Sequence, residues 1–455
     1  MHFKFMKKLV TSVILFLLFI QFGFAQSEFM VQNKRQSTRI NFELINNLII
    51  IPVEINGVVL SFLLDTGVSK PIVFSFLNVS DTLKLKDTET IYLRGLGEGN
   101  SVKALKSKNN IFKIGDALKL NQDLYEIFDS NLNFAPRLGV PVHGIIGFDL
   151  FKDLVVEINY SRKYIRLANP EKYKYRKCKK CEVLNLEFYN NKPCINVEVS
   201  VNKKNIPIKL LIDSGGSDAL WLFEDDSLGI EINHPFFVDF LGYGLSGSVY
   251  GKRSTIDALI LKSFVLENAN VAYPDDTSII SAKKNKDRNG TLAGNILKRF
   301  NVIIDYQKAI MTIKKNSYFK EKFSYNKSGI ELAYDGVRLV KEKDNGVSVR
   351  KSGIPENEKA TNSSRIVIDT KFKLSLKPAY SIVELRLDSP AHRAGLMLND
   401  VILSINGKPA HEFTLQQIIH KFYDFNGKQI RLVVDRDGII LAFNFYLETP
   451  LKTKT

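Results

Sequence analysis

The sequence contains the stretch LSFLLDTG at residues 60–67 and, further along the chain, the stretch IKLLIDSG at residues 208–215. Each stretch is an apolar run that ends in an aspartate, a hydroxyl residue and a glycine. Such a run is typical of a buried strand, and the glycine marks a tight turn at its end. The two stretches therefore predict two strands that each deliver one carboxylate, Asp65 or Asp213, to the mouth of a loop. One such tripeptide alone is equally well explained as an ordinary turn, because Asp, Thr and Gly are common turn residues.

The segments around the two aspartates repeat as well. In the first half, Asn56-Gly57 separates two apolar runs and predicts a hairpin that leads into Asp65. Glycine-rich stretches follow the aspartates at residues 95–99 and 242–247, and glycines in this density suit a loop at the tip of a β-hairpin. An apolar-apolar-glycine motif, a short helix and two closing strands then complete each half. A repeat of this length predicts two similar closed β lobes, at residues 40–170 and 182–315.

Two carboxylates that are held close together have a defined chemistry. Both cannot ionise without a large electrostatic cost, so they share a proton and titrate as a pair. The ionised carboxylate can act as general base on a water molecule while the protonated one polarises a carbonyl group. This chemistry hydrolyses an amide without a metal or a covalent intermediate, so we expect no cofactor and no metal. A hydrolytic triad is not supported, because His143 and His234 have no partner Ser or Cys motif.

The doubled motif resembles the retropepsin and pepsin superfamily of aspartic proteases, over about residues 40–315. The resemblance implies that Asp65 and Asp213 form a catalytic dyad. The residues that it implies as supports of the two catalytic loops are Thr66, Gly67, Ser214, Gly215, Gly147 and Gly294. It also implies a flap over the site, for which the candidates are Gly95, Gly97, Gly242 and Tyr243. The chain departs from the pepsin pattern after each glycine, since Val68 and Gly216 stand where pepsins often carry a serine.

The last third of the chain resembles a PDZ domain. The motifs that carry this resemblance are SPA at residues 389–391, AGL at 394–396, DVI at 400–402 and ING at 405–407. They imply a PDZ domain at residues 323–450, with a charged, loop-rich insertion around 341–379. PDZ domains bind C-terminal peptide tails by strand addition beside a helix, and backbone amides hold the tail carboxylate. The residues expected at this groove are Gly329 and Ile330 in the carboxylate loop and Leu415, Ile418 and Ile419 on a helix at 413–423. The alternative is a PDZ fold that only packs on the protease.

The first 25 residues have the pattern of a secretory signal peptide, with three lysines before a short apolar core and small residues up to Ala25. We expect cleavage after Ala25 and export through the Sec pathway, to the periplasm or out of the cell. The alternative is an uncleaved N-terminal anchor. After signal removal we expect no stable membrane span. Residues 26–38 carry no pattern and are expected to form a disordered lead-in.

The formal net charge is +16, and three of the lysines that contribute to it lie in the signal segment. The basic run at residues 172–180 is expected to be a solvated linker between the lobes. No nucleic-acid-binding motif accompanies the charge, so we expect no nucleic-acid partner. The three cysteines, Cys178, Cys181 and Cys194, are too few for a disulfide scaffold or a zinc site. One disulfide among them is compatible with export, and the sequence leaves the pair open.

Retropepsin-like lobes followed by one PDZ domain look like a family of exported bacterial aspartyl proteases. The prediction is therefore a mostly β aspartic endopeptidase that hydrolyses peptide bonds in peptide or protein substrates, with a PDZ domain for substrate or regulatory tails. The alternative is a non-catalytic exported peptide-binding protein on a protease scaffold. The enzyme is favoured because both aspartates are intact, each in its full tripeptide.

Overall fold

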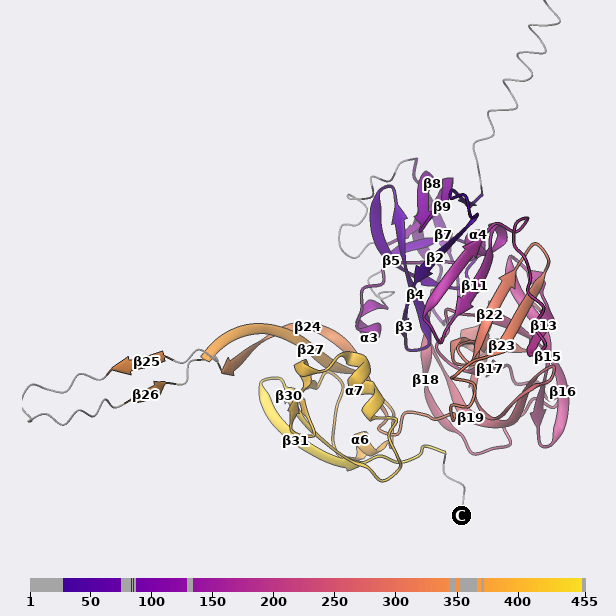
Figure 1. The fold of residues 1–455 in the computed structure, drawn as a ribbon. Helices are drawn as coiled ribbons and strands as arrows, with labels where there is room; N and C mark the ends of the chain where they lie inside the picture. Colours follow the sequence, from indigo (N-terminus) through magenta and orange to yellow (C-terminus); the bar gives the residue numbers. More distant parts are fainter. Residues whose placement is uncertain are drawn as a thin grey trace, which may run out of the picture. The chain divides into compact units, whose positions relative to one another are not determined.

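The computed structural model describes residues 28–74, 83, 85, 87–128, 134–343, 348–351, 366–369 and 372–451. The chain forms two compact units, one up to Asn326 and one from Lys327 to Glu448, each with its own hydrophobic core (Figure 1). The expected signal segment lies outside the described residues. Within the described residues, no helix is long and apolar enough to cross a membrane. The mostly β fold that the sequence predicts is confirmed.

The first sheet of the larger unit carries Asp65. Its strands are β1 (Met30–Val31), β3 (Glu43–Ile45), β4 (Leu48–Ile55), β5 (Val58–Leu64), β6 (Ile72–Phe74), β7 (Glu89–Leu93), β8 (Val102–Ile114), β9 (Ala117–Ile127) and β10 (Gly144–Ile146). The pairings run in a circuit from β4 through β5, β10, β6, β9 and β8 back to β4. The last three residues of β5 are buried. Neighbouring parts of the structure cover both faces of the strand there, so its side chains are apolar on both faces. Two short helices, α3 (Ala135–Leu138) and α4 (Phe148–Asp153), flank β10.

The second sheet carries Asp213 and repeats the first. Its strands are β14 (Glu187–Tyr189), β15 (Lys192–Val201), β16 (Lys204–Asp213), β17 (Leu220–Leu222), β18 (Phe237–Gly244), β19 (Gly247–Leu261), β20 (Phe264–Pro274) and β21 (Gly290–Ala293). The circuit here runs from β15 through β16, β21, β17, β20 and β19 back to β15. Strands β15 to β21 thus correspond to β4 to β10, one for one. The 3-10 helix η2 (Asp276–Ile279) precedes β21, and α5 (Gly294–Leu297) follows it.

A third sheet takes strands from both halves of the larger unit. Its order is β13 (Cys181–Asn185), β23 (Ile310–Lys315), β22 (Phe300–Asp305), β11 (Val155–Asn159), β12 (Tyr164–Ala168) and β2 (Ser37–Asn41). Strand β11 of the first half pairs with β22 of the second, and this joins the two halves through backbone hydrogen bonds.

The lead-in expected to be disordered at residues 26–38 is partly ordered. Strand β1 pairs with β9, and β2 starts at Ser37 and pairs with β12. Phe29 and Val31 are each only 2% exposed, so alternate side chains of this segment are buried. A strand of two residues is too short to show periodicity in the sequence.

Among the described residues, the smaller unit contains a six-stranded sheet and two short α-helices. Its order is β24 (Ile330–Lys343), β27 (Phe372–Leu385), β28 (Val401–Ile405), β30 (Gln429–Arg436) and β31 (Ile439–Tyr446), with β29 (Lys408–Pro409) beside β28. The helices are α6 (Pro390–Arg393) and α7 (Leu415–Lys421), and η3 (Ala410–Glu412) leads to α7. Helix α7 begins at a capping box of Thr414 and Gln417, which satisfies two of its first backbone N–H groups.

The part of the insertion at residues 341–379 that the structure describes forms paired strands, where the sequence predicted loops. Strands β24 and β27 stay paired out to Lys343 and Phe372, and β25 (Ser348–Lys351) pairs with β26 (Ile366–Asp369) beyond them. Charged residues dominate this segment, so they masked its alternating pattern. The remaining residues of the insertion lie outside the described part.

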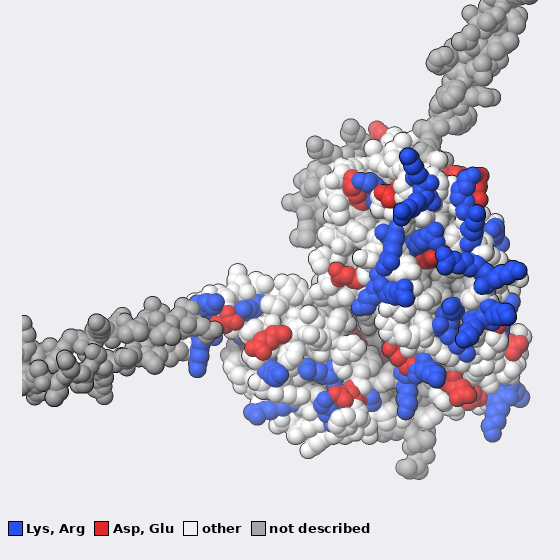
Figure 2. Space-filling view, in the orientation of Figure 1, with Lys and Arg blue, Asp and Glu red and all other residues white. Residues whose placement is uncertain are grey.

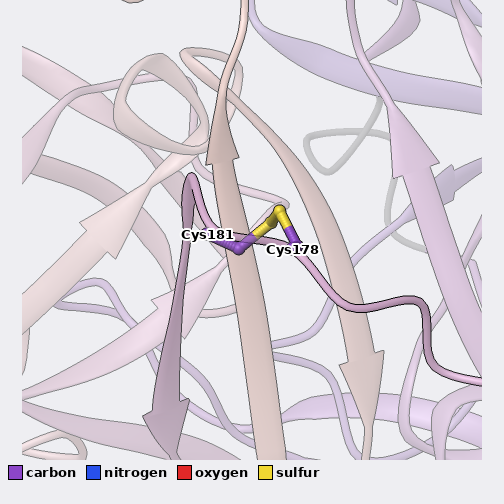
Figure 3. The surroundings of a disulfide bond; sticks show 2 residues. All are labelled: Cys178 and Cys181. Carbon is purple, nitrogen blue, oxygen red and sulfur yellow. A yellow bond between two sulfur atoms is a disulfide. The ribbon is translucent and has the colours of Figure 1, made fainter.

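Cys178 and Cys181 form a disulfide where the linker enters β13 (Figure 3). Cys194 is a buried free thiol in β15. The bond closes a very short loop, so it stiffens the end of the linker. It removes little chain entropy from the unfolded state and therefore adds little to the stability of the fold. The lysines and arginines on the face shown in Figure 2 are interspersed with acidic side chains.

Candidate active site

Asp65 and Asp213 stand at the ends of matching strands. Asp65 follows the last residue of β5, and its N–H donates to the carbonyl of Ile146 in the parallel strand β10 at 2.8 Å. Asp213 is the last residue of β16 and pairs with Ala293 in the parallel strand β21. The apolar runs that precede both aspartates are buried, so packing fixes the strands and aims their ends at one place.

The two carboxyl groups meet across the glycines that follow them. The N–H of Gly67 donates to Oδ1 of Asp65 at 2.6 Å, and the N–H of Gly215 donates to Oδ1 of Asp213 at 2.9 Å. A Cβ added at Gly215 would lie 2.4 Å from Oδ2 of Asp65, and one at Gly67 would lie 3.2 Å from Oδ1 of Asp213. Gly215 therefore has to be glycine because the carboxyl group of Asp65 occupies the space of a side chain, and a side chain at Gly67 would be crowded by both carboxyls.

Thr66 and Ser214 tie the two loops together by reciprocal hydrogen bonds. The N–H of Thr66 donates to Oγ of Ser214 at 3.0 Å, and the N–H of Ser214 donates to Oγ1 of Thr66, also at 3.0 Å. The hydroxyls in turn donate to the carbonyls of Ile212, at 2.7 Å, and Leu64, at 2.8 Å. Both side chains are buried, so water cannot replace these bonds. The network fixes one aspartate relative to the other.

Gly147 and Gly294 follow the strands that flank the aspartates. A Cβ on Gly147 would lie 1.9 Å from the carbonyl oxygen of Asp65. A Cβ on Gly294 would lie 2.7 Å from the carbonyl oxygens of Asn47 and Gly216. Close backbone approach therefore requires glycine at both positions, and both lie where the sequence placed them as supports of the loops.

The electrostatics of the pair are those of two acids that share a proton. Burial raises the pKa of Asp65 well above its usual value, and the nearby charge of Asp213 raises it further. The hydrogen bond from Gly67 and the positive charge of Lys192 act on that pKa in the opposite direction. One carboxyl of the pair therefore stays protonated beyond the pH at which an exposed aspartate ionises.

The two glycine-rich stretches lie at hairpin tips and touch each other. Residues 94–101 join β7 to β8, and residues 245–246 join β18 to β19. The N–H of Ser246 donates to the carbonyl of Leu96 at 2.8 Å, and the N–H of Gly99 donates to the carbonyl of Ser246 at 2.6 Å. Cβ atoms on Gly95 or Gly97 would lie 2.8 and 2.6 Å from atoms of the opposite tip. The sequence did not predict that the two tips meet.

Tyr243 contacts the first half from the second tip. Nη2 of Arg137 in α3 donates to the hydroxyl of Tyr243 at 3.2 Å, and its guanidinium lies 4.7 Å from the centre of the ring. Gly242 has φ of +148° and open space around its Cα. A cavity of about 620 Å³ adjoins Tyr243, and its apolar lining is Val102, Leu105, Phe128 and Leu245.

In the smaller unit, β24 is an outer strand of its sheet and α7 packs beside it. Gly329, with φ of +83°, and Ile330 lie at the start of β24, and the N–H of Ile330 donates to Oγ of Ser328 at 3.0 Å. Leu415 and Ile418 are buried in the core of this unit, and Ile419 is partly buried against it. The helix residues expected at a groove therefore hold α7 in place, and an outer strand beside a helix remains as the feature suited to strand addition.

Two residues near the dyad were not expected from the sequence. Lys192 begins β15, and Arg288 lies just before β21. The charges of both carboxyls of the dyad act on Lys192, and that of Asp213 acts on Arg288. A residue-by-residue alignment of the two halves would have revealed them as basic residues at positions that are apolar in the first half. No group of three or more potential metal ligands occurs among the described residues.

Comparison with known proteins supports both parts of this description. Residues 51–150 match the family model of an aspartyl protease, and residues 382–436 match that of a PDZ domain. The chain therefore contains an aspartyl protease domain followed by a PDZ domain. The matched protease segment includes Asp65 and ends before Asp213, which the structure adds through the repeat. No curated protein matches the chain.

Proposed function

We propose that the protein is an aspartic endopeptidase in which a water molecule activated between Asp65 and Asp213 attacks a peptide bond. The observation that carries this proposal is the reciprocal network of Thr66 and Ser214, which holds two half-buried carboxyls close together. The ionised carboxyl takes a proton from the water, and the protonated one donates to the carbonyl oxygen of the scissile bond. The oxygen of the water bonds to the carbonyl carbon, and collapse of that intermediate releases the amine after it has gained a proton.

The contact between the hairpin tips suits this reaction. The tips have to part so that a peptide can enter, and their closure excludes bulk water from the bound substrate. The glycines on both tips permit backbone approach in the closed arrangement.

The test is digestion of a mixed peptide library by the full chain from acid to neutral pH, beside Asp65→Asn and Asp213→Asn. We expect products from the wild type and none from either variant, with unchanged circular dichroism. Products that persist in both variants would reject the dyad. No wild-type products at any pH would favour a non-catalytic peptide-binding protein.

We further propose that the PDZ domain takes up peptide tails along β24, by strand addition next to α7. Its role is to recruit substrates or to regulate the protease. Removal of the C-terminal carboxylate of a bound tail by amidation should abolish the binding, as fluorescence anisotropy of labelled peptides would show.

The proposal includes export of the chain through its first 25 residues. The sequence pattern of this segment supports it. N-terminal sequencing of the mature protein from a bacterial envelope fraction should give Gln26 as the first residue, and an intact N-terminus would reject cleavage.

A further inference from the structure

The two halves of the larger unit differ in charge at two pairs of equivalent positions near the dyad, and strand pairing establishes the first. In the first half Ile50 pairs with Leu63, and in the second half Cys194 pairs with Leu211. Both leucines stand two residues before the aspartate of their half. In both halves the partner strand begins two residues before that pairing. The residues at these equivalent strand starts are Leu48 and Lys192.

A second pair of equivalent positions is fixed by hydrogen bonds. The N–H of His143 donates to the carbonyl of Ser61 at 2.8 Å, and the N–H of Asn289 donates to the carbonyl of Lys209 at 2.9 Å. Ser61 and Lys209 both stand four residues before the aspartate. The residues immediately before these two donors are Val142 and Arg288.

These positions belong to one surface in each half. In the first half Leu48, Leu63, Val142 and Ile145 are members of a single buried apolar cluster. The equivalent residues of the second half are Lys192, Leu211, Arg288 and Thr291. The pairing of Ile145 with Leu63 and of Thr291 with Leu211 confirms the correspondence. One side of the dyad is therefore apolar, and the other side carries two cations.

The two cations have no carboxylate partner of their own. The side chain of Lys192 makes no hydrogen bond or ion pair with any residue that the structure describes, and it is partly exposed. Arg288 donates only to neutral groups among the described residues, to the carbonyl of Gly290 at 2.9 Å and to Oγ1 of Thr291 at 2.5 Å. Burial lowers the pKa of Lys192, and the nearby positive charge of Arg288 lowers it further. The carboxyl groups whose charge acts on them are those of the dyad, and ionisation of one of these is disfavoured, so two cations face a pair of acids that does not readily carry two negative charges. This leaves positive charge next to the dyad that a further carboxylate can balance.

We propose that Lys192 and Arg288 form a subsite for a carboxylate of the peptide substrate, on the second-half side of the dyad. This inference rests on the proposed peptidase function. A guanidinium and an ammonium group that converge on one carboxylate form charge-assisted hydrogen bonds. The carboxylate belongs either to an Asp or Glu side chain or to the C-terminus of a peptide. The dyad itself is shared by both halves, so this charge asymmetry gives the substrate a direction.

The apolar side complements this subsite. The cavity of about 620 Å³ near the hairpin tips is lined by Val102 and Leu245, which pack against the apolar cluster of the first half. An apolar side chain of the substrate suits this cavity. The enzyme should therefore prefer peptides with an apolar residue on one side of the scissile bond and a carboxylate on the other.

The test uses the full chain and a set of peptides built on one cleaved library sequence with both ends blocked. Glu, Gln, Leu and Lys are placed in turn at each of the positions that flank the cleaved bond. We expect one position at which Glu gives kcat/KM about tenfold or more above Gln, with Lys the poorest. A parallel Gln peptide that ends shortly after the cleaved bond is tested with a free and with an amidated C-terminus. A gain from the free end alone assigns the subsite to the C-terminal carboxylate.

The variants place residues of the first half at the equivalent positions of the second half. Lys192→Leu and Arg288→Val introduce the residues found at the equivalent positions, so they are expected to keep the fold. Both should reduce the Glu-to-Gln ratio toward one while cleavage of the Leu peptide continues. Lys192→Arg should keep the preference. Lys204→Leu, at the far exposed end of the same hairpin, should leave every ratio unchanged.

The outcomes separate this inference from the proposed function. Cleavage that requires Asp65 and Asp213 but ignores the charge of the peptide would overturn the subsite and leave the peptidase. If no peptide is cleaved, the proposed function fails, and the same blocked Glu and Gln peptides are then compared for binding to the wild type and to Lys192→Leu. Equal affinity of both peptides for the wild type would overturn the subsite in that case as well.

Discussion

The hydroxyl of Thr66 serves two backbone groups of the opposite loop at once. It accepts from the N–H of Ser214 and donates to the carbonyl of Ile212. Thr66→Val keeps the shape and leaves both groups buried without this partner, so we expect a loss of about 1–3 kcal/mol in the free energy of unfolding. Activity should fall as well, because the two aspartates are then no longer held in a fixed position relative to each other.

The matched control is Thr66→Ser, which puts into the first loop the residue that the second loop carries. It should keep most of the stability and activity, as urea denaturation and peptide cleavage would show. A loss in Thr66→Ser with none in Thr66→Val would mean that the methyl group, and not the hydroxyl, holds the loops.

The raised pKa of Asp65 links the stability of the protein to pH. Its folded-state pKa lies above its unfolded value near 3.8, because burial and the charge of Asp213 disfavour ionisation. Its contribution to stability is therefore fully present below about pH 3.8 and is lost as the pH rises through the raised pKa. Asp65→Asn removes this loss while its Oδ1 can still accept from Gly67.

We therefore expect Asp65→Asn to melt at a higher temperature than the wild type at neutral pH. The difference should shrink as the pH is lowered toward 3.8, as calorimetry at a series of pH values would show. A variant that is less stable than the wild type at neutral pH would contradict the raised pKa.

Much of the candidate site could be predicted because its residues belong to motifs that are visible in the sequence. The two tripeptides contain both aspartates and the glycines that follow them, and a side chain at either glycine would crowd the carboxyl groups. The cations could not be found in the same way. Lys192 and Arg288 belong to no motif, and their proximity to the dyad depends on strand register, which single-sequence periodicity does not give.

Gly97 and Gly57 both lie at hairpin tips, and a comparison of the two can test what closure of the tips contributes. Both have positive φ, and an alanine would be strained at either one. A Cβ at Gly97 would also lie 2.6 Å from backbone atoms of Gly247, whereas nothing lies within 4 Å of one at Gly57. Gly97→Ala and Gly57→Ala should therefore lose similar stability, about 1 kcal/mol, from backbone strain.

Only Gly97→Ala should also reduce kcat/KM for a library peptide, because the tips can no longer close as they do here. Thermal melts and cleavage assays on the two variants would separate these effects. An equal loss of activity in both would show that closure of the tips does not contribute to the reaction.

The elements that sequence analysis missed share a physical cause. Strand β1 is set by pairing with β9 over two residues, which is less than one period of any pattern. In the outer part of the β24–β27 ribbon, at residues 334–343 and 372–378, no residue is buried, so the backbone pairing there is not accompanied by a buried face. Strands of these kinds form because a partner strand pairs with them. A short window of the sequence contains the strand and not its partner, so it does not predict the pairing.

At the scale of the whole molecule, the two units have cores that share no residue. Each core should therefore unfold as its own cooperative transition. Ile418 is fully buried in the smaller unit, and Leu150 is fully buried in the larger one. Replacing a buried Ile or Leu by Ala costs about 2–5 kcal/mol.

We therefore expect Ile418→Ala to lower one of two calorimetric transitions and Leu150→Ala to lower the other. At a temperature between the two transitions of Ile418→Ala, cleavage of short peptides should continue, because the dyad and its network lie wholly in the larger unit. Binding of peptide tails should be lost at that temperature. A single transition that moves with both substitutions would mean that the units fold together. Loss of short-peptide cleavage when only the smaller unit has melted would mean that the PDZ domain is needed for catalysis itself, and not only for the choice of substrate.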